Sequence, residues 1–562
     1  MKGLRRILST TLLVLAFVLT NILVSKYLGR VDMTSSKLYS LSDKNREIIE
    51  DVGDRLVATL FLGDNIPASF QKLKSETEFF LRSLHSVNGN IWADVFDPTQ
   101  GSAPQLNAIA KIFADNNVNA VRIRVNSADG MKETRVYPYV HLESKNGDRY
   151  INILEGRRPN ETEEDAIFRS IQKLESKITK GVYELSKPLT SKVAIVAFED
   201  LVNRKVFDLS NVLRRDYQTE IISPKTLFEK RDSCAVAILP VNSSMEISKE
   251  DLVYVDQYLM LGGKLFWLVE EYGISVDSIN KYGEFIPESK ELSFSDYLFH
   301  HGVKINGTWL SDWRSSRIPQ VVGEQGGRAQ TEMFNYPYHP VMEGSDHLIS
   351  KDLKEMNLFY PTVIEMVNTA STITKTPLIQ SSEYSTTLSY PHIFSFDFLK
   401  EEPSLDSHGE NDLITGLLVE GHFESYFKNR INSKQSNEWS QKGITLTANS
   451  EIETAQIIVT DQDMILPKSL PNGRLFPIGY NTWERRTFED NKRFMINAID
   501  YLINGEKFLM PDERAEYKLA ALDKRKVASS GRKLSVINLL FAPFILLVLH
   551  LGLRLYLKKR YA

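Results

Sequence analysis

Few side chains in the sequence suggest catalysis or ligand binding. The string most similar to a nucleotide-binding motif does not have the glycine spacing that the motif requires. A phosphate-binding loop of an ATPase needs the pattern G-x-x-x-x-G-K-[ST], because backbone amides cradle the phosphates and the lysine reaches them. The nearest string is Gly262-Gly263-Lys264-Leu265, with Tyr258 where the first glycine belongs. Paired glycines after an apolar helical segment are typical of a helix end. The sequence therefore favours a helix end over a phosphate site.

A thiol mechanism is similarly disfavoured by the position of the cysteine. An amidotransferase needs a nucleophilic cysteine on a tight turn after a strand, with a histidine as its base. The sequence has one cysteine, Cys234, and it begins an apolar strand. We therefore expect a buried structural thiol. One cysteine also excludes an intrachain disulfide framework.

Carboxylates and histidines give two weak candidates for metal binding. Asp461 and Asp463 follow a strand, and with Glu420 near them they could hold a hard cation through oxygen ligands. Carboxylates at a strand end are more often turn or helix caps. The pair His300-His301 ends a predicted helix, where cationic side chains interact favourably with the helix dipole. We predict no metal ion at either place.

Trp309 and Trp313 lie in an aromatic-rich region, where they could form a sugar-stacking platform or pack in a core or interface. Packing is the preferred interpretation. We find no nucleophile–base pair at recognisable spacing. The sequence therefore predicts no catalytic residue, no cofactor and no enzymatic activity.

Helices and strands alternate through the first part of the chain, which predicts an α/β unit with a mixed sheet. The expected helices cover residues 43–50, 69–85, 104–115 and 163–183, and the expected strands cover residues 56–62, 90–96, 118–125, 136–142 and 150–154.

A second unit opens after Pro188 with the β-α-β-α-β order of a doubly wound fold. Its expected elements are strands 192–198, 220–223, 234–239 and 264–269, with helices 206–217 and 248–261. Residues 273–380 are expected to be irregular. Strands near 414–420 and 455–460 and a helix at 489–503 are expected to complete the second sheet.

Apolar runs at residues 7–25 and 534–553 frame this body. Each is about as long as a helix must be to cross a bilayer, and Pro543 in the second run is tolerated in spanning helices. We predict two uncleaved spans around a soluble body. A cleaved signal peptide is the alternative for the first run, but no small-residue cleavage site follows it.

The charges beside the spans orient the chain only mildly. Lysines and arginines lie on both sides of each run, so the positive-inside rule leans toward cytoplasmic termini. Asn21 and Asn538 lie within the runs and are costly to face toward lipid. We expect both to contact a membrane partner, and hydration near the headgroups is the alternative.

Composition excludes one large class of function. The net charge is −4 and 25% of the residues are charged, without the basic balance of a nucleic-acid-binding protein. The body between the spans is long enough for two to four domains.

Six segments together resemble one known family. They are Arg30-Val-Asp-Met-Thr with Lys37-Leu-Tyr-Ser-Leu-Ser42, Phe61-Leu-Gly-Asp-Asn-Ile-Pro67 with Phe70-Gln-Lys-Leu73, Asp94-Val-Phe-Asp-Pro98, Val255-Asp-Gln-Tyr-Leu-Met-Leu-Gly-Gly263, Val419-Glu-Gly-His-Phe-Glu-Ser-Tyr-Phe-Lys-Asn-Arg430 and Asn491-Lys-Arg-Phe-Met-Ile-Asn-Ala-Ile-Asp-Tyr-Leu502. In this order, between two apolar runs, they resemble the auxiliary subunit of the gliding-motility-associated ABC transporter, the GldG family of Bacteroidota. One departure is Thr460-Asp461-Gln462-Asp463, where the family usually has a Gly-Asp-x-Asp turn.

The resemblance implies a periplasmic body, a role in gliding motility and a complex with a polytopic permease and a separate ATPase. It also implies that the second α/β domain is similar to class I glutamine-amidotransferase-like folds. It supplies no ligand site, and the ligand stays open between a periplasmic protein and a glycan.

The expected organisation follows from these observations. Residues 1–28 form a cytoplasmic tail and the first span, 29–187 the first α/β domain, 188–272 and 381–510 the second, 273–380 an aromatic-rich insertion, 511–533 a basic linker, and 534–562 the second span and a cytoplasmic tail. We expect a non-enzymatic accessory subunit of an ABC transporter in the inner membrane, which acts as a scaffold or binds a ligand. The alternative from another class is a doubly anchored envelope hydrolase or transferase. A solute-binding protein is disfavoured because the two α/β units differ in length and strand pattern.

Overall fold

The structure is a computed structural model that describes residues 41–505 and 550–560, apart from gaps at 65, 117, 128–129, 157–160, 187–191, 199–203, 288–291, 352, 370–371, 397–407, 469–474, 555 and 558. The first predicted span, nearly all of the second, and both Asn21 and Asn538 lie outside the described residues. Within the part that the structure describes, no helix combines the length and the apolar character needed to cross a membrane.

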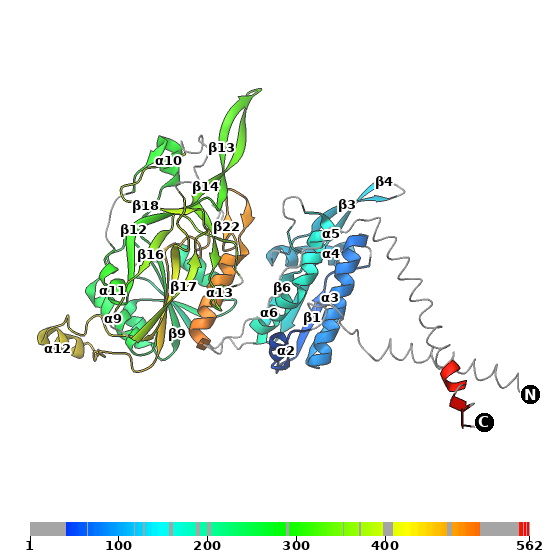
Figure 1. The fold of residues 1–562 in the computed structure, drawn as a ribbon, viewed down its shortest axis with the longest axis horizontal. Coiled ribbons are helices and arrows are strands. Elements are labelled where there is room, and N and C mark those ends of the chain that lie inside the picture. The colour runs from blue at the N-terminus through cyan, green and yellow to red at the C-terminus, as the bar shows by residue number, and fades with distance from the viewer. Residues whose placement is uncertain are drawn as a thin grey trace, which may run out of the picture. The chain divides into compact units, whose positions relative to one another are not determined.

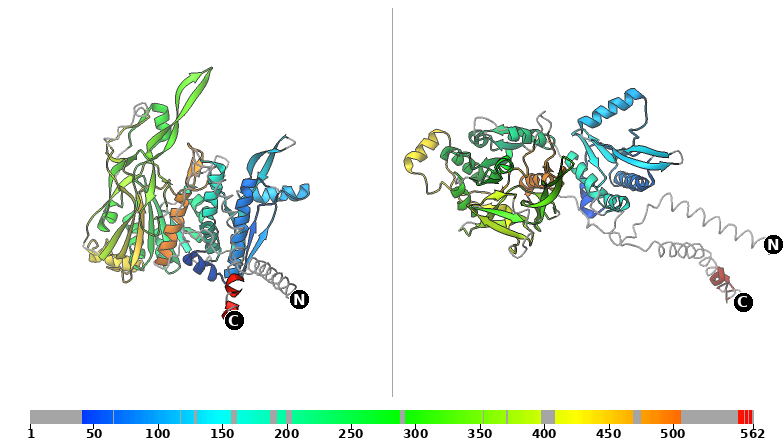
Figure 2. Two further views of the ribbon diagram at one scale, coloured as in Figure 1. Left: turned by 45° about the vertical axis from the view of Figure 1, so that its right-hand side comes forward. Right: turned by 90° about the horizontal axis from the view of Figure 1, so that it is seen from above.

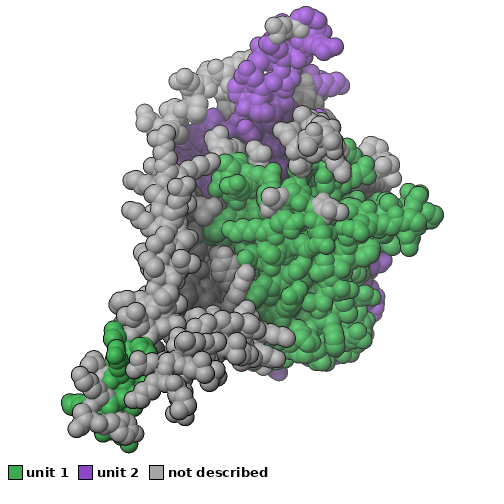
Figure 3. Space-filling view, turned by 90° about the vertical axis from the view of Figure 1, so that its right-hand side faces the viewer, with its two compact units in different colours: residues 1–182, 512–562 green, residues 183–511 purple. Residues whose placement is uncertain are grey.

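The chain divides into two compact units (Figure 3). Unit 1 comprises residues 1–182 with 512–562, and unit 2 comprises residues 183–511. The sequence placed the corresponding boundary at 187/188. Each unit is described by itself below.

Unit 1 is built on a mixed four-stranded sheet, as predicted, in the order β2-β1-β5-β6. Strands β1 and β2 are parallel, and helix α3 makes the crossover between them. Strand β5 runs antiparallel to both β1 and β6. The elements are α2 (Asp43–Glu50), β1 (Leu56–Leu60), α3 (Ala68–Val87), β2 (Ile91–Val95), α4 (Ala103–Asp115), β3 (Val121–Ser127), β4 (Gly130–Val136), β5 (Tyr139–Ser144), β6 (Gly147–Asn152), α5 (Glu163–Gln172) and α6 (Leu174–Ser186).

Three details of unit 1 differ from the sequence expectations. The predicted strand at 118–125 is one arm of a separate hairpin, β3–β4. The predicted helix at 163–183 is interrupted at Lys173, giving α5 and α6. Residues 90–96 alternate between apolar and polar side chains in the sequence, but strand β2 does not alternate between buried and exposed positions; four of its five residues are exposed.

A buried charge cluster ties α5 to the segment that precedes it. Arg169 is 6% exposed, and its guanidinium lies 3.1 Å from Glu155 Oε2 and 2.6 Å from Glu161 Oε2. The same group donates to the Gly156 carbonyl at 2.7 Å. Burial raises the pKa of Glu155, but the ammonium groups of Lys177 and Lys173 outweigh this and hold it at about 2. The cluster therefore keeps its charges compensated inside the unit.

Unit 2 is built on a ten-stranded sheet that is parallel at one end and antiparallel at the other (Figures 1 and 2). The order is β13-β14-β17-β20-β21-β10-β9-β7-β8, with β15 paired to β14. The strands are β7 (Lys192–Val196), β8 (Gln218–Ile222), β9 (Cys234–Asn242), β10 (Lys264–Glu270), β13 (Ser315–Gln325), β14 (Arg328–Gly344), β15 (Met356–Asn357), β17 (Thr372–Gln380), β20 (Ile414–His422) and β21 (Thr454–Val459).

The five parallel strands form the predicted doubly wound part of unit 2. Their order, β8-β7-β9-β10-β21, is the 2-1-3-4-5 order of one common doubly wound architecture. Helices α7 (Arg204–Leu213) and α13 (Glu489–Asn504) pack on one face, and helices α8 (Pro224–Glu229) and α9 (Lys249–Met260) pack on the other. Both faces of these strands are therefore buried, as parallel sheets require.

Helix α9 begins and ends where the sequence predicted. The Ser248 hydroxyl accepts from the Asp251 backbone at 3.0 Å and caps the first turn. At the other end Gly262 has a φ of +92°, and a Cβ on Gly263 would lie 2.4 Å from the Tyr258 ring. Glycine is required here for the turn and for the close ring contact, so the predicted helix end is confirmed.

The segment 273–380, expected to be irregular, carries long strands instead. The hairpin of β13 and β14 projects from the rest of unit 2 (Figures 1 and 2). Its register shifts between Ser315 and Arg317 and between Val321 and Gly323, and these bulges interrupt the alternating pattern by which a strand is recognised.

The remaining elements of unit 2 frame the sheet. They are α10 (Val276–Tyr282), β11 (Glu284–Phe285), α11 (Ser295–His300), β12 (Val303–Asp312), β16 (Thr362–Met366), β18 (Ser385–Ser389), β19 (Phe394–Ser395), α12 (Ser433–Gln441), β22 (Tyr480–Asn481) and β23 (Arg486–Thr487). Strands β16, β12 and β18 form a small antiparallel sheet.

Candidate functional site

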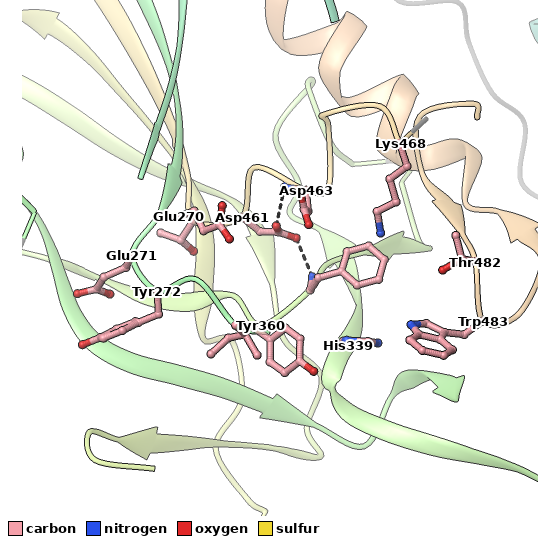
Figure 4. A pocket seen from close by; sticks show the side chains of 13 residues that line it. Glu270, Glu271, Tyr272, His339, Tyr360, Asp461, Asp463, Lys468, Thr482 and Trp483 are labelled. Atoms are coloured by element: carbon pink, nitrogen blue, oxygen red, sulfur yellow. Dashed lines mark hydrogen bonds between the residues drawn. The ribbon is translucent and has the colours of Figure 1, made fainter. Parts of the chain in front are cut away.

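Unit 2 has a pocket of about 220 Å³ at the carboxyl ends of β10 and β21 (Figure 4). Glu270 is the last residue of β10, and Glu271 follows it directly. Asp461 and Asp463 lie just after β21. Because β10 and β21 are parallel neighbours, these four carboxyl groups come to the same edge of the sheet. Ligands of open α/β sheets bind at this edge.

The opposite wall comes from segments distant in the sequence. His339 lies on β14, Tyr360 follows β15, and Lys468, Thr482 and Trp483 come from the chain between β21 and α13. Figure 4 shows the carboxylates on one side and Lys468, Thr482 and Trp483 on the other, with His339 and Tyr360 between them. The pocket therefore has one acidic wall and one wall of hydrogen-bond donors and aromatic rings.

The two aspartates are in different electrostatic states. Asp461 is buried and accepts from the Phe359 backbone at 2.7 Å and the Asp463 backbone at 2.8 Å. Burial, with the Asp463 carboxylate beside it, raises the pKa of Asp461 well above its usual range. Asp463 instead accepts from Lys205 Nζ at 2.6 Å and forms an ion pair.

The two glutamates at the end of β10 are also compensated. Glu270 accepts a hydrogen bond from the Gln462 amide. Burial, and then Asp463, raise the pKa of Glu270. Glu271 accepts from the Gly307 backbone at 3.1 Å, and burial raises its pKa to about 7. The acidic wall therefore carries less negative charge than its composition suggests.

His339 and Lys468 are the least compensated groups of the pocket. His339 is 1% exposed, and neither of its ring nitrogens has a hydrogen-bond partner among the described residues. Burial, with the Lys468 ammonium nearby, lowers the pKa of His339 well below its usual range, so the imidazole is neutral. Lys468 Nζ lies 3.7 Å from the centre of the Phe359 ring, and burial lowers its pKa against the opposing effect of the Asp463 and Asp461 carboxylates.

Tyr360 lines the pocket with a strained backbone. Its φ is +51°, a region that bulky residues rarely adopt. Its backbone donates to the Tyr338 carbonyl at 2.7 Å, and its hydroxyl lies 3.1 Å from that of Tyr336. Such strain is concentrated at functional sites, so Tyr360 supports the view that the pocket is functional.

Three buried asparagines hold the donor wall in place. Asn357 Nδ2 donates to the carbonyl of His339 at 3.2 Å, and its Oδ1 accepts from Asn481 Nδ2 at 2.9 Å. Asn481 Oδ1 accepts from the Trp483 backbone at 2.9 Å. Asn491 Oδ1 accepts from the Asn357 backbone at 2.9 Å. This asparagine network therefore links β14, β15, the loop after β22 and the start of α13.

The polar groups in the described lining of this pocket include carboxyl groups, one imidazole, one ammonium group and hydroxyl groups. The described lining contains no cysteine or serine; its two threonines are Thr460, whose hydroxyl donates to the Thr362 carbonyl, and Thr482. The imidazole of His339 packs against the rings of Tyr336, Phe359 and Tyr360. Among the residues that the structure describes, no group of three or more His, Cys, Asp or Glu is placed to hold a metal ion.

The structure separates Glu420 from the two aspartates that the sequence placed near it. Strand β20 is antiparallel to β21, and its register pairs Glu420 with Ala455 at the other end of β21. Glu420 accepts from the Tyr501 hydroxyl at 3.2 Å. The candidate three-carboxylate group is therefore not formed, because the direction of β20 places Glu420 at the other end of β21.

The other candidates from the sequence lie outside the pocket. Cys234 is 5% exposed at the amino end of β9, the end opposite the pocket edge, and burial raises the pKa of its thiol. His301 is 2% exposed, burial lowers its pKa to about 3, and its Nε2 faces the Glu424 carbonyl at 3.3 Å, as that of His300 does at 3.1 Å. Trp309 is fully buried in an aromatic core with Phe394, so it packs in the core and forms no open platform.

Sequence reasoning missed four of the residues that define the pocket: Glu270, Glu271, His339 and Lys468. A signal existed for the glutamates, because they directly follow a predicted parallel strand and so belong to the ligand edge of the sheet. No comparable signal marked His339 or Lys468.

Comparison with known proteins assigns the class. A family model described as an ABC-type uncharacterized transport system matches residues 185–498, and a model described as a domain of unknown function (DUF7088) matches residues 35–143. The first match covers more than half of the chain. The chain therefore belongs to this family and is an auxiliary component of an ABC transport system.

Individual proteins add no information about the function of the chain. No curated protein matches the chain. Two solved structures are similar over 62% of it: Gan42B, a GH42 β-galactosidase, at 11% identity and a TM-score of 0.20, and a catalytic mutant of the same enzyme from G. stearothermophilus at 10% and 0.21. The chain spans 35% of the length of each of these enzymes. Similarity at this level carries no argument about function.

Proposed function

We propose that this chain is a non-enzymatic accessory subunit of an ABC transporter, anchored in the inner membrane and linked to gliding motility. The observation that carries the proposal is the family match over residues 185–498. The resemblance of the six sequence segments to the GldG family extends it to gliding. The partners are a polytopic permease and a separate ATPase.

The pocket of unit 2 supports a binding role within that complex. It lies at the carboxyl edge of the sheet, where doubly wound folds bind ligands. We propose that it serves a periplasmic ligand, carried on a protein or a glycan, and that unit 2 is related to class I glutamine-amidotransferase-like folds. The 2-1-3-4-5 strand order is compatible with such a relationship.

The proposed topology places both termini in the cytoplasm and residues 29–533 in the periplasm. We test it with Lys225→Cys in a Cys234→Ala background, since the Lys225 side chain is 62% exposed. A membrane-impermeant maleimide should label residue 225 in intact cells. A cysteine at Ala562 should react only after the inner membrane is permeabilised. Labelling at 562 with protection at 225 would contradict the topology.

Co-purification tests the complex and the role of the spans. The full chain should recover a permease and an ATP-hydrolysing subunit from solubilised membranes. Replacing residues 7–25 by polyleucine together with Asn538→Leu removes Asn21 and Asn538, and recovery should fall about 3-fold to 15-fold, the usual value of interhelical polar contacts.

Each alternative has its own signature in this experiment. Undiminished recovery by the polyleucine variant would show the spans to be plain tethers. Recovery of the native chain alone, with neither transporter subunit, would favour the doubly anchored hydrolase or transferase instead.

A further inference from the structure

The four carboxyl groups in the acidic wall of the pocket already have hydrogen-bond or ion-pair partners within the protein. Asp463 is paired with Lys205 at 2.6 Å, and Asp461 accepts two backbone hydrogen bonds while buried. Glu270 is bonded to Gln462, and Glu271 to the Gly307 backbone. A cationic ligand would therefore find carboxylates that already have partners.

The opposite wall, which carries the hydrogen-bond donors of Lys468 and His339, has few partners for its polar groups. Lys468 Nζ forms no ion pair within 4.0 Å among the described residues; the Asp463 and Asp461 carboxylates act on it only from farther away, and the centre of the Phe359 ring lies 3.7 Å from it. His339 is 1% exposed with both ring nitrogens unpartnered in the same described set. A buried polar group without a hydrogen bond costs on the order of 1–3 kcal/mol of stability, so such groups are normally satisfied. A ligand would satisfy both residues.

We propose that the pocket binds an oxyanion, a carboxylate or phosphate group of a small ligand or ligand terminus, between Lys468 and His339. Trp483 lies beside these two side chains and gives the ligand an apolar face to rest on (Figure 4). The proposal rests on the proposed ligand-binding role of the pocket and is independent of the contacts with the transporter subunits.

The protonation state of His339 narrows the ligand further. A neutral imidazole offers one N–H donor and one nitrogen acceptor. Burial keeps His339 neutral. The ligand must therefore present an acceptor, which the oxyanion supplies, and a donor next to it. A hydroxyl group adjoining the acidic group meets both needs, as in a hydroxy acid, a sugar acid or a sugar phosphate.

The experiment uses the full chain in detergent and four probes: glucuronate, acetate, inorganic phosphate and glucose. Saturation-transfer difference NMR follows the carbon-containing probes, and ³¹P line broadening follows phosphate. Glucuronate should bind saturably and more tightly than acetate, and glucose should not compete. Glucuronate and phosphate distinguish a carboxylate source from a phosphate source.

Two substitutions locate the effect. Lys468→Met should weaken binding of the preferred anion at least about 10-fold, the value of a hydrogen bond to a charged group. Lys442→Met is the matched control, because Lys442 is an exposed lysine of the same unit that pairs with Glu250 at 2.8 Å. It should leave binding unchanged. If the Lys468→Met variant does not fold, Lys468→Gln replaces it as the variant that removes the ammonium group.

The outcomes decide the proposal. Saturable binding of either acid that is lost in the Lys468 variants supports it and names the oxyanion. Absence of saturable binding by glucuronate, acetate and phosphate overturns it, as does binding that the Lys468 variants leave unchanged or that glucose matches. None of these results bears on co-purification, so the accessory role would stand or fall separately.

Discussion

Replacing Arg169 by alanine is expected to destabilise unit 1 by about 3–5 kcal/mol. The substitution removes the guanidinium that compensates Glu155 and Glu161 inside the unit and leaves two carboxylates partly buried without it. Hydrogen exchange of α5 and α6, followed in the full chain at increasing urea, measures the loss. Arg46→Ala is the control: Arg46 is half-exposed and lies 4.0 Å from Glu50, so its removal should cost less than about 1 kcal/mol.

The same cluster predicts how unit 1 responds to acid. The pKa of Glu155 is about 2 in the folded chain and 4.5 for an ordinary glutamate, so the folded state favours the charged form. Its contribution to stability is fully present above pH 4.5 and is lost as the pH falls toward 2. Glu155→Gln should flatten this part of the stability profile. If the Glu155→Gln variant and the unsubstituted chain lost stability equally in acid, the cluster would not stabilise the unit. Equal stability of the Arg169→Ala and Arg46→Ala variants would lead to the same conclusion.

Asn357→Leu is expected to destabilise unit 2 by about 3 kcal/mol or more, because it strips partners from several buried polar groups at about 1–3 kcal/mol each. Asn357 Nδ2 lies within 3.4 Å of four acceptors, namely Ser316 Oγ and the carbonyls of His339, Pro340 and Leu358. Leucine branches at Cγ as asparagine does and is larger, so no cavity is left, and the loss comes from the missing hydrogen bonds together with the added bulk.

Hydrogen exchange separates this effect from general loosening. The segment from β22 to β23 should lose protection first, since Asn481 loses its Asn357 partner there. Asn504→Ala is the control, because Asn504 is an exposed residue that bonds the Asp500 carbonyl within its own helix. Unchanged protection of the β22–β23 segment in the Asn357 variant would contradict a supporting role for the asparagine network.

Much of the fold could be predicted because it is encoded locally. The Ser42 and Ser248 caps mark the starts of α2 and α9 within a few residues. Strands such as β10 are buried on both faces, so they appear as continuous apolar runs. The same reasoning failed for β13 and β14, whose bulges and exposed tip leave no continuous pattern. Tertiary pairing, and not local propensity, makes these residues strands.

The candidate site was less predictable because it is assembled from distant segments. Asp461 and Asp463 were identified since they follow a strand in the sequence. Whether Glu420 joins them depends on the direction in which β20 runs, and nothing local encodes that direction. His339 and Lys468 meet through the asparagine network: Asn357 donates to the His339 carbonyl, and Asn491, 134 positions from Asn357, donates to the Met464 carbonyl just before Lys468. The two membrane spans stay predictions, since they lie outside the described residues.

The position of β21 has a consequence for how unit 2 is made. This strand pairs with β10 as the last parallel strand of the sheet. Trp267 on β10 donates a side-chain hydrogen bond to Gln456 on β21, and the two residues lie 189 positions apart in the sequence. At a synthesis rate of 5–20 residues per second, β21 is synthesised about 10–40 s after β10. During this interval the backbone N–H and C=O groups along one edge of β10 lack their strand partner, and the apolar face that α13 later covers lacks that helix. Unit 2 therefore completes its core late in synthesis, and the nascent chain must be protected from aggregation until residues 454–504 have emerged.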